Sequence, residues 1–291
     1  MHTDETLHTN EIIRAEHLSY LYDDDKTALN DINVSIYEGE RIAVIGSNGA
    51  GKSTFFLNLN GVLTCTEGTI FFHGKPVGHK NRDLNELRRK VGIVFQDADN
   101  QIIASTVMAE VSFGPMNMGL PREEVARRVD EALDYMNISE FKKRPAHYLS
   151  GGEKKRVSIA DIIAMKPEVI IFDEPTASLD PVNAAMFEEV LDKLEKDNTT
   201  LLVSTHDVDF AYRWAQRVLV FCNGKIIADG KPSCIFRRED ILKQANLKKP
   251  ILLEVCEILQ KKGLLADDTE FPVNISGFET FAQQLCSNRQ I

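Results

Sequence analysis

Short apolar runs separated by polar turns recur along the chain and predict β-strands. The early runs alternate with polar residues, whereas those at residues 169–172 and 200–204 are almost continuously apolar. Continuous runs are typical of strands that are covered on both faces of a parallel sheet. Asn223 and Gly224, a pair typical of hairpin turns, separate the last two runs. The predicted strands are residues 12–18, 32–36, 41–45, 69–72, 91–95, 169–172, 200–204, 218–221 and 225–228.

Apolar residues at helical spacing predict helices elsewhere in the chain. The first predicted helix opens directly on a glycine-rich loop, and a long, mainly helical stretch interrupts the strands. In the last part of the chain, Pro250 occupies the first helical position and Gly263 marks the end of the same helix. The predicted helical segments are residues 52–59, 106–165, 181–196, 250–262 and 278–285. The pattern therefore predicts an α/β core with a helical insertion, followed by a helical tail from about Arg238.

Composition narrows the classes of protein that fit this pattern. The chain has 291 residues, 43% hydrophobic and 27% charged, as in an ordinary folded protein. Its formal charge of -10 disfavours general nucleic-acid binding, because phosphate backbones carry the same sign. No apolar run approaches the ~20 residues that cross a bilayer, and no signal-peptide core begins the chain, so we expect a cytoplasmic chain without a membrane span.

Cysteine and histidine residues give no sign of a structural metal. The five cysteines are scattered and form no CxxC pair, which indicates neither a disulfide framework nor a zinc site. His2 and His8 lie in a polar leader at residues 1–10, and we interpret them as leader residues rather than metal ligands.

The sequence GSNGAGKST lies between a predicted strand and a predicted helix and matches the phosphate-binding pattern G-x-x-x-x-G-K-[ST]. Its glycines let backbone N–H groups turn toward phosphates, and the start of the helix favours an anion. We expect Lys52 to contact the phosphates and the Ser53 hydroxyl to hold Mg²⁺. The predicted nucleotide-binding residues of this loop are Gly46, Ser47, Asn48, Gly49, Ala50, Gly51, Lys52, Ser53 and Thr54.

Two consecutive carboxylates, Asp173 and Glu174, end the apolar strand of the sequence VIIFDE. Charges at the mouth of a buried strand are costly unless something there needs them. A magnesium nucleotide does, because Asp173 can bind the metal and Glu174 can orient and deprotonate the attacking water. An ordinary polar strand end is the alternative, which the nearby phosphate loop disfavours.

A second glycine-containing helix start occurs in the sequence LSGGEKKR at residues 149–156. Such a start also favours an anion, but one nucleotide has little use for two of them. The second start therefore predicts contact with a nucleotide that another copy of the chain holds.

Taken together, these motifs resemble those of the ATP-binding cassette (ABC) ATPases. The phosphate loop, Gln96, LSGGE, VIIFDE, the sequence SLDP at residues 178–181 and His206 follow the family's order over residues 12–230. The resemblance implies an α/β P-loop NTPase fold, with a RecA-like core sheet, an antiparallel β subdomain and a helical subdomain at about residues 97–165. The cassette would span residues 11–238, and a short helical extension residues 239–291.

The resemblance also implies individual roles. Gln96, otherwise an ordinary surface residue, would touch Mg²⁺ and the attacking water, and His206 would hydrogen-bond to the γ-phosphate of ATP. Asp180 would couple two sites, while Tyr22, with Tyr20 as the competing candidate, would stack on adenine. The implied contacts to a second copy's γ-phosphate are Ser150, Gly151 and Gly152. The implied catalytic set is Lys52, Gln96, Glu174 and His206, and the implied metal ligands are Ser53, Gln96 and Asp173.

Two residues depart from the family pattern. Glu153 replaces the commoner glutamine of the signature, a change that should not abolish activity. Asp161 stands where related sequences carry glycine or arginine, and the sequence leaves open whether it lies in solvent or meets a partner.

The sequence FQDADNQIIASTVMAEVSFGP at residues 95–115 resembles the ATPases of energy-coupling-factor (ECF) importers, which take up vitamins or transition metals. The tail from Asn246 is most similar to the cobalt-import branch, with nickel import as its near neighbour. The resemblance implies an ATPase at the cytoplasmic face of the cell membrane that couples hydrolysis to import. Its partners would be a second ATPase subunit, which we expect to be identical, a membrane scaffold (T component) and a substrate-binding membrane subunit (S component).

Several alternatives stay open. The ATPase could energise vitamin uptake, because the separate membrane subunit selects the solute. A soluble cassette protein that acts on ribosomes or DNA is a rival, although the acidic charge disfavours it, and a cassette unable to hydrolyse ATP is another. The groove near residues 96–113 is predicted to receive short helices of the scaffold. The amphipathic tail is expected either to hold two ATPases together or to pack on its own domain.

Overall fold

The computed structural model of the chain describes residues 10–23, 26–177, 179–266 and 269–288. His2, His8, almost all of the predicted leader and Ser178 of the SLDP sequence lie outside the described residues. Within the described ranges, no helix is long and apolar enough to cross a membrane.

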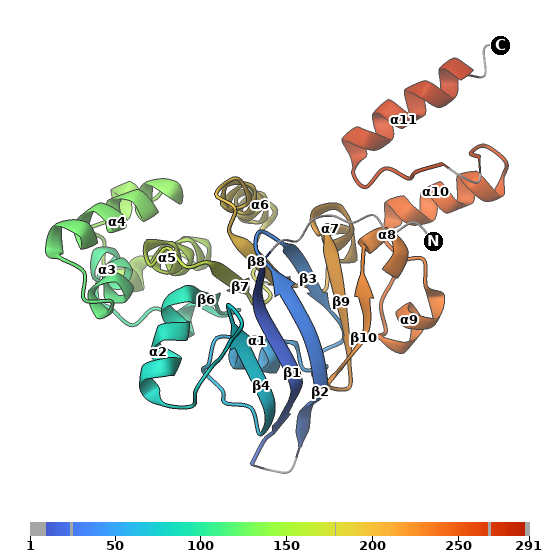
Figure 1. Ribbon diagram of the computed structural model, residues 1–291. Helices are drawn as coiled ribbons and strands as arrows, with labels where there is room; N and C mark the ends of the chain where they lie inside the picture. Colours follow the sequence, from blue (N-terminus) through green and yellow to red (C-terminus); the bar gives the residue numbers. More distant parts are fainter. Residues whose placement is uncertain (1–9, 24–25, 178, 267–268, 289–291) are drawn as a thin grey trace.

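A six-stranded sheet, in the order β10-β9-β3-β8-β7-β6, forms the centre of the molecule (Figure 1). The five strands from β9 to β6 run parallel, and β10 is antiparallel to β9. Val94, Phe172 and Val203 lie in register on neighbouring strands, so these strands end at one edge of the sheet. The strands are β3 (Arg41–Ile45), β6 (Val91–Val94), β7 (Val169–Phe172), β8 (Thr200–Ser204), β9 (Arg217–Cys222) and β10 (Lys225–Gly230).

Both faces of this sheet are covered, which explains its continuous apolar runs. In β3, Ile42 and Val44 belong to one hydrophobic cluster, and Ala43 and Ile45 belong to another on the opposite face. Successive side chains of a strand point to opposite faces, so a strand buried on both faces needs apolar residues at every position.

A second, four-stranded antiparallel sheet has the order β2-β1-β4-β5. It comprises β1 (Glu11–Leu21), β2 (Thr27–Tyr37), β4 (Glu67–Phe72) and β5 (Lys75–Pro76). Leu18 and Leu29 of this sheet share a hydrophobic cluster with Phe55 and Phe56 of the first helix, α1 (Lys52–Leu59). The core sheet and the antiparallel sheet confirm the predicted fold class, and the sheets bury α1 between them.

The helical insertion consists of α3 (Val107–Asn117), α4 (Arg122–Tyr135) and α5 (Gly151–Ala164), which pack against one another. Their apolar side chains, such as Val111, Val129 and Val157, join one cluster with Phe172 of the core sheet. Short 3-10 turns lie at Ala98–Asn100, Ser139–Phe141 and Ala146–Tyr148. The helix α6 (Pro181–Lys196) packs its apolar stripe into the same cluster.

The apolar pattern failed to predict four short helices. They are α2 (Asn81–Lys90), α7 (Val208–Trp214), α8 (Pro232–Ile235) and α9 (Glu239–Gln244). Helix α2 is so polar that Leu87 is its single buried residue, which leaves little apolar periodicity to read. Pro250 proves to be the cap just before its helix rather than the first helical residue.

The tail continues the core. Helix α10 (Ile251–Lys261) buries Leu253 and Cys256 in the same cluster as Val218 of the central sheet, so the predicted boundary near Arg238 divides segments that share one cluster. The other side of α10 leaves Ile251 and Ile258 exposed. Helix α11 (Ile275–Asn288) lies beyond α10 at the edge of the molecule (Figure 1).

Asp161 lies on α5 where that helix packs against α3. Its Oδ1 atom is inaccessible to solvent and has no hydrogen-bond partner among the described residues. Burial raises the pKa of Asp161 to about 7, and the charge of nearby Glu110 acts in the same direction, while a hydrogen bond from Gln101 opposes both. Asp161 therefore meets α3 of its own chain.

Replacing Asp161 by Asn should make the folded protein less sensitive to pH. The folded state holds the Asp161 proton up to about pH 7, whereas the unfolded chain releases it near its ordinary pKa of 3.8. The free energy of unfolding should therefore fall as pH rises through this window, by about 2 kcal/mol between pH 5 and pH 8. Urea unfolding at both pH values measures the difference between wild type and Asp161→Asn. The exposed Asp192 supplies the control Asp192→Asn, and an equal pH dependence in all three proteins would contradict this account.

Candidate functional site

The phosphate loop joins β3 to α1 and is pressed against the neighbouring strand. Gly46 adopts a φ of +149°, and a Cβ at this position would lie 2.3 Å from the carbonyl oxygen of Phe221. Gly224, in the turn after β9, donates its N–H to Ala50 O at 3.0 Å, and its own carbonyl accepts the N–H of Asn30. The hairpin of β9 and β10 therefore braces the loop from behind.

The start of α1 is open to an anion. No side chain caps this helix, and no acidic residue lies in its first turn. Lys52 is only 5% exposed, and its Nζ donates to Gly46 O at 2.8 Å. Burial lowers the pKa of Lys52, while the charge of Glu174 opposes this shift. An uncapped helix start beside a buried lysine fits the phosphates of a nucleotide.

The two carboxylates follow the end of β7, and Ser204 at the end of β8 fixes both. The Ser204 hydroxyl donates to Asp173 Oδ1 at 2.6 Å and accepts the backbone N–H of Glu174 at 2.8 Å. Glu174 has a φ of +44°, a strained conformation for a residue with a Cβ, as is frequent at functional sites. Ser204 was not among the predicted site residues, although a hydroxyl residue at the end of an apolar strand is a signal that the sequence shows.

Glu174 contacts two other residues of the predicted catalytic set, and the three residues follow three different strands. Its Oε1 lies 3.5 Å from Lys52 Nζ and 2.7 Å from His206 Nε2. His206 follows β8 and is exposed, whereas the carboxylate of Glu174 is 16% exposed. The structure thus unites Lys52, Glu174 and His206 of the predicted catalytic set in one cluster, in which a carboxylate can accept a proton beside two groups that bind anions.

The predicted magnesium ligands have the right chemistry for that ion. Ser53 and Gln96 are exposed, and the buried Asp173 keeps its second carboxylate oxygen free of the Ser204 bond. They follow β3, β6 and β7, whose carboxyl ends share one edge of the sheet. Mg²⁺ prefers oxygen donors and takes few from the protein when phosphates supply others. No cluster of three or more His, Cys, Asp or Glu side chains suited to a metal occurs in the described part of the chain.

Tyr22 is the better placed of the two aromatic candidates. Its hydroxyl lies 3.0 Å from Thr54 Oγ1 on α1, and its ring is partly exposed. Tyr20 packs against the hydrophobic cluster under the antiparallel sheet and meets the edge of Tyr22, with ring centroids 5.0 Å apart. Tyr22 thus offers a ring beside the phosphate loop, and its stacking on adenine stays a prediction.

The signature residues lie on a different element from the phosphate loop. Ser150 and Glu153 form a capping box at the start of α5: the Ser150 side chain accepts the N–H of Glu153, and the Glu153 carboxylate accepts the N–H of Ser150 at 2.7 Å. Hydrogen bonding from the Ser150 backbone lowers the pKa of Glu153, which also pairs with Arg144. The unusual Glu153 is therefore a helix cap, and Gly151 beside it is exposed.

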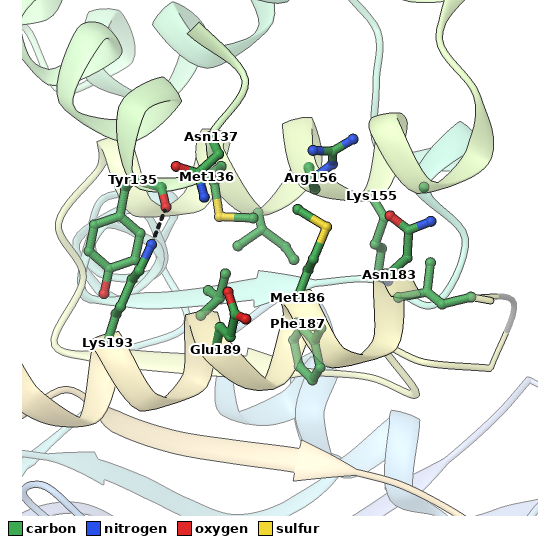
Figure 2. A pocket seen from close by; sticks show the side chains of 14 residues that line it. Tyr135, Met136, Asn137, Lys155, Arg156, Asn183, Met186, Phe187, Glu189 and Lys193 are labelled. Carbon is green, nitrogen blue, oxygen red and sulfur yellow. Dashed lines mark hydrogen bonds between the residues drawn. The ribbon is translucent and has the colours of Figure 1, made fainter. Parts of the chain in front are cut away.

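Gly152 connects this signature to the SLDP segment. A Cβ on Gly152 would lie 2.7 Å from the amide nitrogen of Asn183, and that amide donates to Asp180 Oδ2 at 2.7 Å. Figure 2 shows Asn183 and Met186 of α6 facing Lys155 and Arg156 of α5. The cavity between these helices measures about 20 Å³, room for a single water and far too small for a nucleotide.

A phosphate loop between a buried parallel strand and a helix, with a carboxylate-ended strand nearby, defines a P-loop nucleotide-binding protein. The chain belongs more specifically to the ABC transporter family, whose match covers residues 29–177. Its relatives include ATP-binding proteins of energy-coupling factor transporters.

Three curated relatives illustrate the similarity. A putative ABC transporter ATP-binding protein of Methanosarcina mazei is 46% identical over 87% of the chain. The energy-coupling factor transporter ATP-binding protein EcfA2 of Methanospirillum hungatei is 45% identical over 89% of the chain. The chain spans only 56% and 65% of the lengths of these two relatives. The EcfA protein of Methanocaldococcus jannaschii is 46% identical over 90% of the chain, which spans 94% of its length.

Solved structures agree with this family. The cbiO1 protein of Clostridium perfringens, part of the ABC transporter complex cbiONQ, is 40% identical, with a TM-score of 0.72 over 85% of the chain and 99% of its own length. A dimeric ATP-binding cassette, MJ0796, in a post-hydrolysis state with ADP and Pi, is 28% identical, with a TM-score of 0.70 over 76% of the chain and 99% of its own length.

Proposed function

We propose that the chain is the ATP-hydrolysing subunit of an ECF-type importer. The contact of Glu174 with Lys52 and His206 is the observation that carries this proposal. Glu174 would hold the attacking water and accept its proton, while Lys52 and His206 would contact the γ-phosphate. Bound Mg²⁺, held through Ser53, Gln96 and Asp173, would neutralise phosphate charge. Ser204 would keep both carboxylates in place through its two hydrogen bonds.

The active unit would be a homodimer with two composite sites. The phosphate loop lies beside the antiparallel sheet, whereas the signature begins α5 in the helical insertion. One chain thus presents two halves of a site on separate elements, and Ser150, Gly151 and Gly152 would complete the site of the second copy. The dimeric form of the related MJ0796 cassette supports this arrangement.

The membrane partners would dock on an apolar strip around α3. Ile103 is 71% exposed and Met116 is 64% exposed, and Met108 and Phe113 between them are exposed as well. Exposed large apolar side chains that gather in one place are typical of an interaction site. The strip would receive short helices of the T component at the cytoplasmic face of the membrane, and an S component would select the solute.

Cobalt is the proposed solute, with nickel next and a vitamin as the alternative. The similarity to cbiO1, whose complex is named cbiONQ, supports the metal assignment. Uptake of radioactive Co²⁺, Ni²⁺ and vitamins into cells that express the chain with its neighbouring membrane subunits tests it. ATP-dependent uptake of a vitamin alone would replace the metal assignment. Absence of ATP hydrolysis by the purified complex would refute the function itself, and crosslinks from the T component that avoid the α3 strip would refute the docking site.

The tail would contribute to the dimer. Ile251 and Ile258 form an exposed apolar edge on α10, while the opposite side of that helix packs on its own domain. The double variant Ile251→Ser, Ile258→Ser should weaken association of two chains in the absence of nucleotide without unfolding the core. Sedimentation equilibrium of the two proteins tests this idea, and unchanged association would reject it.

A further inference from the structure

A buried lysine outside the proposed catalytic set joins two functional segments. Lys155 lies on α5 and is only 4% exposed. Its Nζ donates to the carbonyl oxygen of Phe95 at 2.6 Å and to that of Gln96 at 3.2 Å. Burying an ammonium group is costly unless acceptors replace its lost water. Here both acceptors belong to the backbone of the segment that carries Gln96.

A second tether reaches the same segment from the same helix. The Gln101 side chain accepts the backbone N–H of Phe95 at 3.2 Å and donates to Ser158 O on α5 at 3.1 Å. Phe95 is therefore held on its N–H by Gln101 and on its carbonyl by Lys155. Residues three apart on a helix share one face, so Lys155 and Ser158 hold the segment from one side of α5.

The signature lies at the start of the same helix. Lys155 follows Gly151 by four positions, which is about 6 Å along the helix axis. The capping box of Ser150 and Glu153 fixes this first turn. A displacement of the signature therefore reaches Lys155 through one stiff turn of helix, without passing through a loop.

We propose that Lys155 is a positioning residue that fastens the Gln96 backbone to the signature helix, so that binding of a nucleotide at the signature moves Gln96. This role rests on the proposed function, because Gln96 acts there on water and metal. Lys155 is buried, and its Nζ would act through the carbonyl oxygens of Phe95 and Gln96 rather than on the nucleotide.

Lys155→Met tests the proposal, because methionine fills a volume similar to that of lysine but donates no hydrogen bond. Lys154, the next residue, is 22% exposed and pairs with Asp99, so Lys154→Met is the matched control. Hydrogen exchange of the nucleotide-free chain should be about tenfold faster over residues 95–101 in Lys155→Met than in wild type, since two hydrogen bonds to a charged group are lost. Unchanged exchange in this segment would overturn the tether, whether or not the chain hydrolyses ATP.

The kinetic test uses the complete complex. Lys155→Met should lower kcat about tenfold, leave the KM for ATP within about twofold, and raise the Mg²⁺ concentration needed for half-maximal rate. Lys155→Gln, which restores a donor, should recover most of the rate, whereas Lys154→Met should resemble wild type. If Lys155→Met lowered kcat only by disturbing the packing of the protein, the hydrogen-bond donor in Lys155→Gln would not restore the rate. Equal loss in the Met and Gln variants, or equal loss in the Lys154 control, would overturn the proposal. An inactive wild-type complex would instead refute the proposed function and leave the exchange result to decide the tether.

Discussion

Glu174→Gln should stop ATP hydrolysis and leave ATP bound. The amide fills the same space as the carboxylate but cannot accept a proton from water, and general bases typically contribute 10²- to 10⁴-fold. We therefore expect kcat to fall by at least about 1000-fold, because Glu174 is also the contact between Lys52 and His206. Phosphate release measures the rate, and size-exclusion chromatography with ATP should detect a dimer that persists.

Glu153→Gln is the control for this experiment. Glu153 is a carboxylate in the signature that has no proposed part in the proton transfer, and glutamine can form the same capping box with Ser150. This variant should keep activity close to that of wild type. Undiminished turnover in Glu174→Gln would remove Glu174 from the role of base, and equal losses in both variants would indicate a general effect of carboxylate removal.

Lys52→Met should abolish tight ATP binding. The Nζ of Lys52 donates to Gly46 O inside the phosphate loop, and its positive charge would contact the proposed phosphates. Removal of this charge should lower the affinity for ATP at least about 100-fold, because a buried charge-assisted contact is lost and Glu174 loses a neutralising partner. Isothermal titration calorimetry with ATP measures the change.

Lys52→Arg separates the effect of the positive charge from the effect of the size and shape of the side chain. The planar guanidinium cannot take the place of a compact ammonium between loop carbonyls, so charge alone should not restore affinity. Lys75→Met, at an exposed position of β5, controls for loss of a positive charge. ATP affinity within about threefold of wild type in Lys52→Met would contradict the proposed role of the loop.

The fold was most predictable where burial is most complete. The apolar runs at residues 169–172 and 200–204 predicted both the strands and their burial, because a strand that is covered on both faces has no position facing solvent. Helix α2 went unpredicted for the opposite reason, since one buried leucine leaves no stripe. The amphipathic pattern of the tail left two options open, association with a second ATPase or packing on its own domain. The cluster that α9 and α10 share with the central sheet is a contact between distant segments, which required the structure.

The residues of the candidate site also differ in how far the sequence predicts them. Lys52 and Glu174 were predicted because their chemistry is written in short, contiguous motifs, and the geometry places them in contact. Ser204 and Lys155 were missed because their roles depend on residues 31 and 60 positions away in the sequence. Asp161 could be recognised as unusual from the sequence, but its burial against α3 required the structure.

The hairpin of β9 and β10 limits where this protein can be engineered. Its turn resembles an ordinary surface loop, yet Gly224 forms backbone hydrogen bonds with Ala50 and Asn30. The backbone of Phe221 lies so close to Gly46 that no side chain fits there. A fluorescent reporter or new chain termini placed there would deform the nucleotide pocket from outside. The turn between β4 and β5 is the better location, because nothing lies within 4 Å of a side chain added at Gly74.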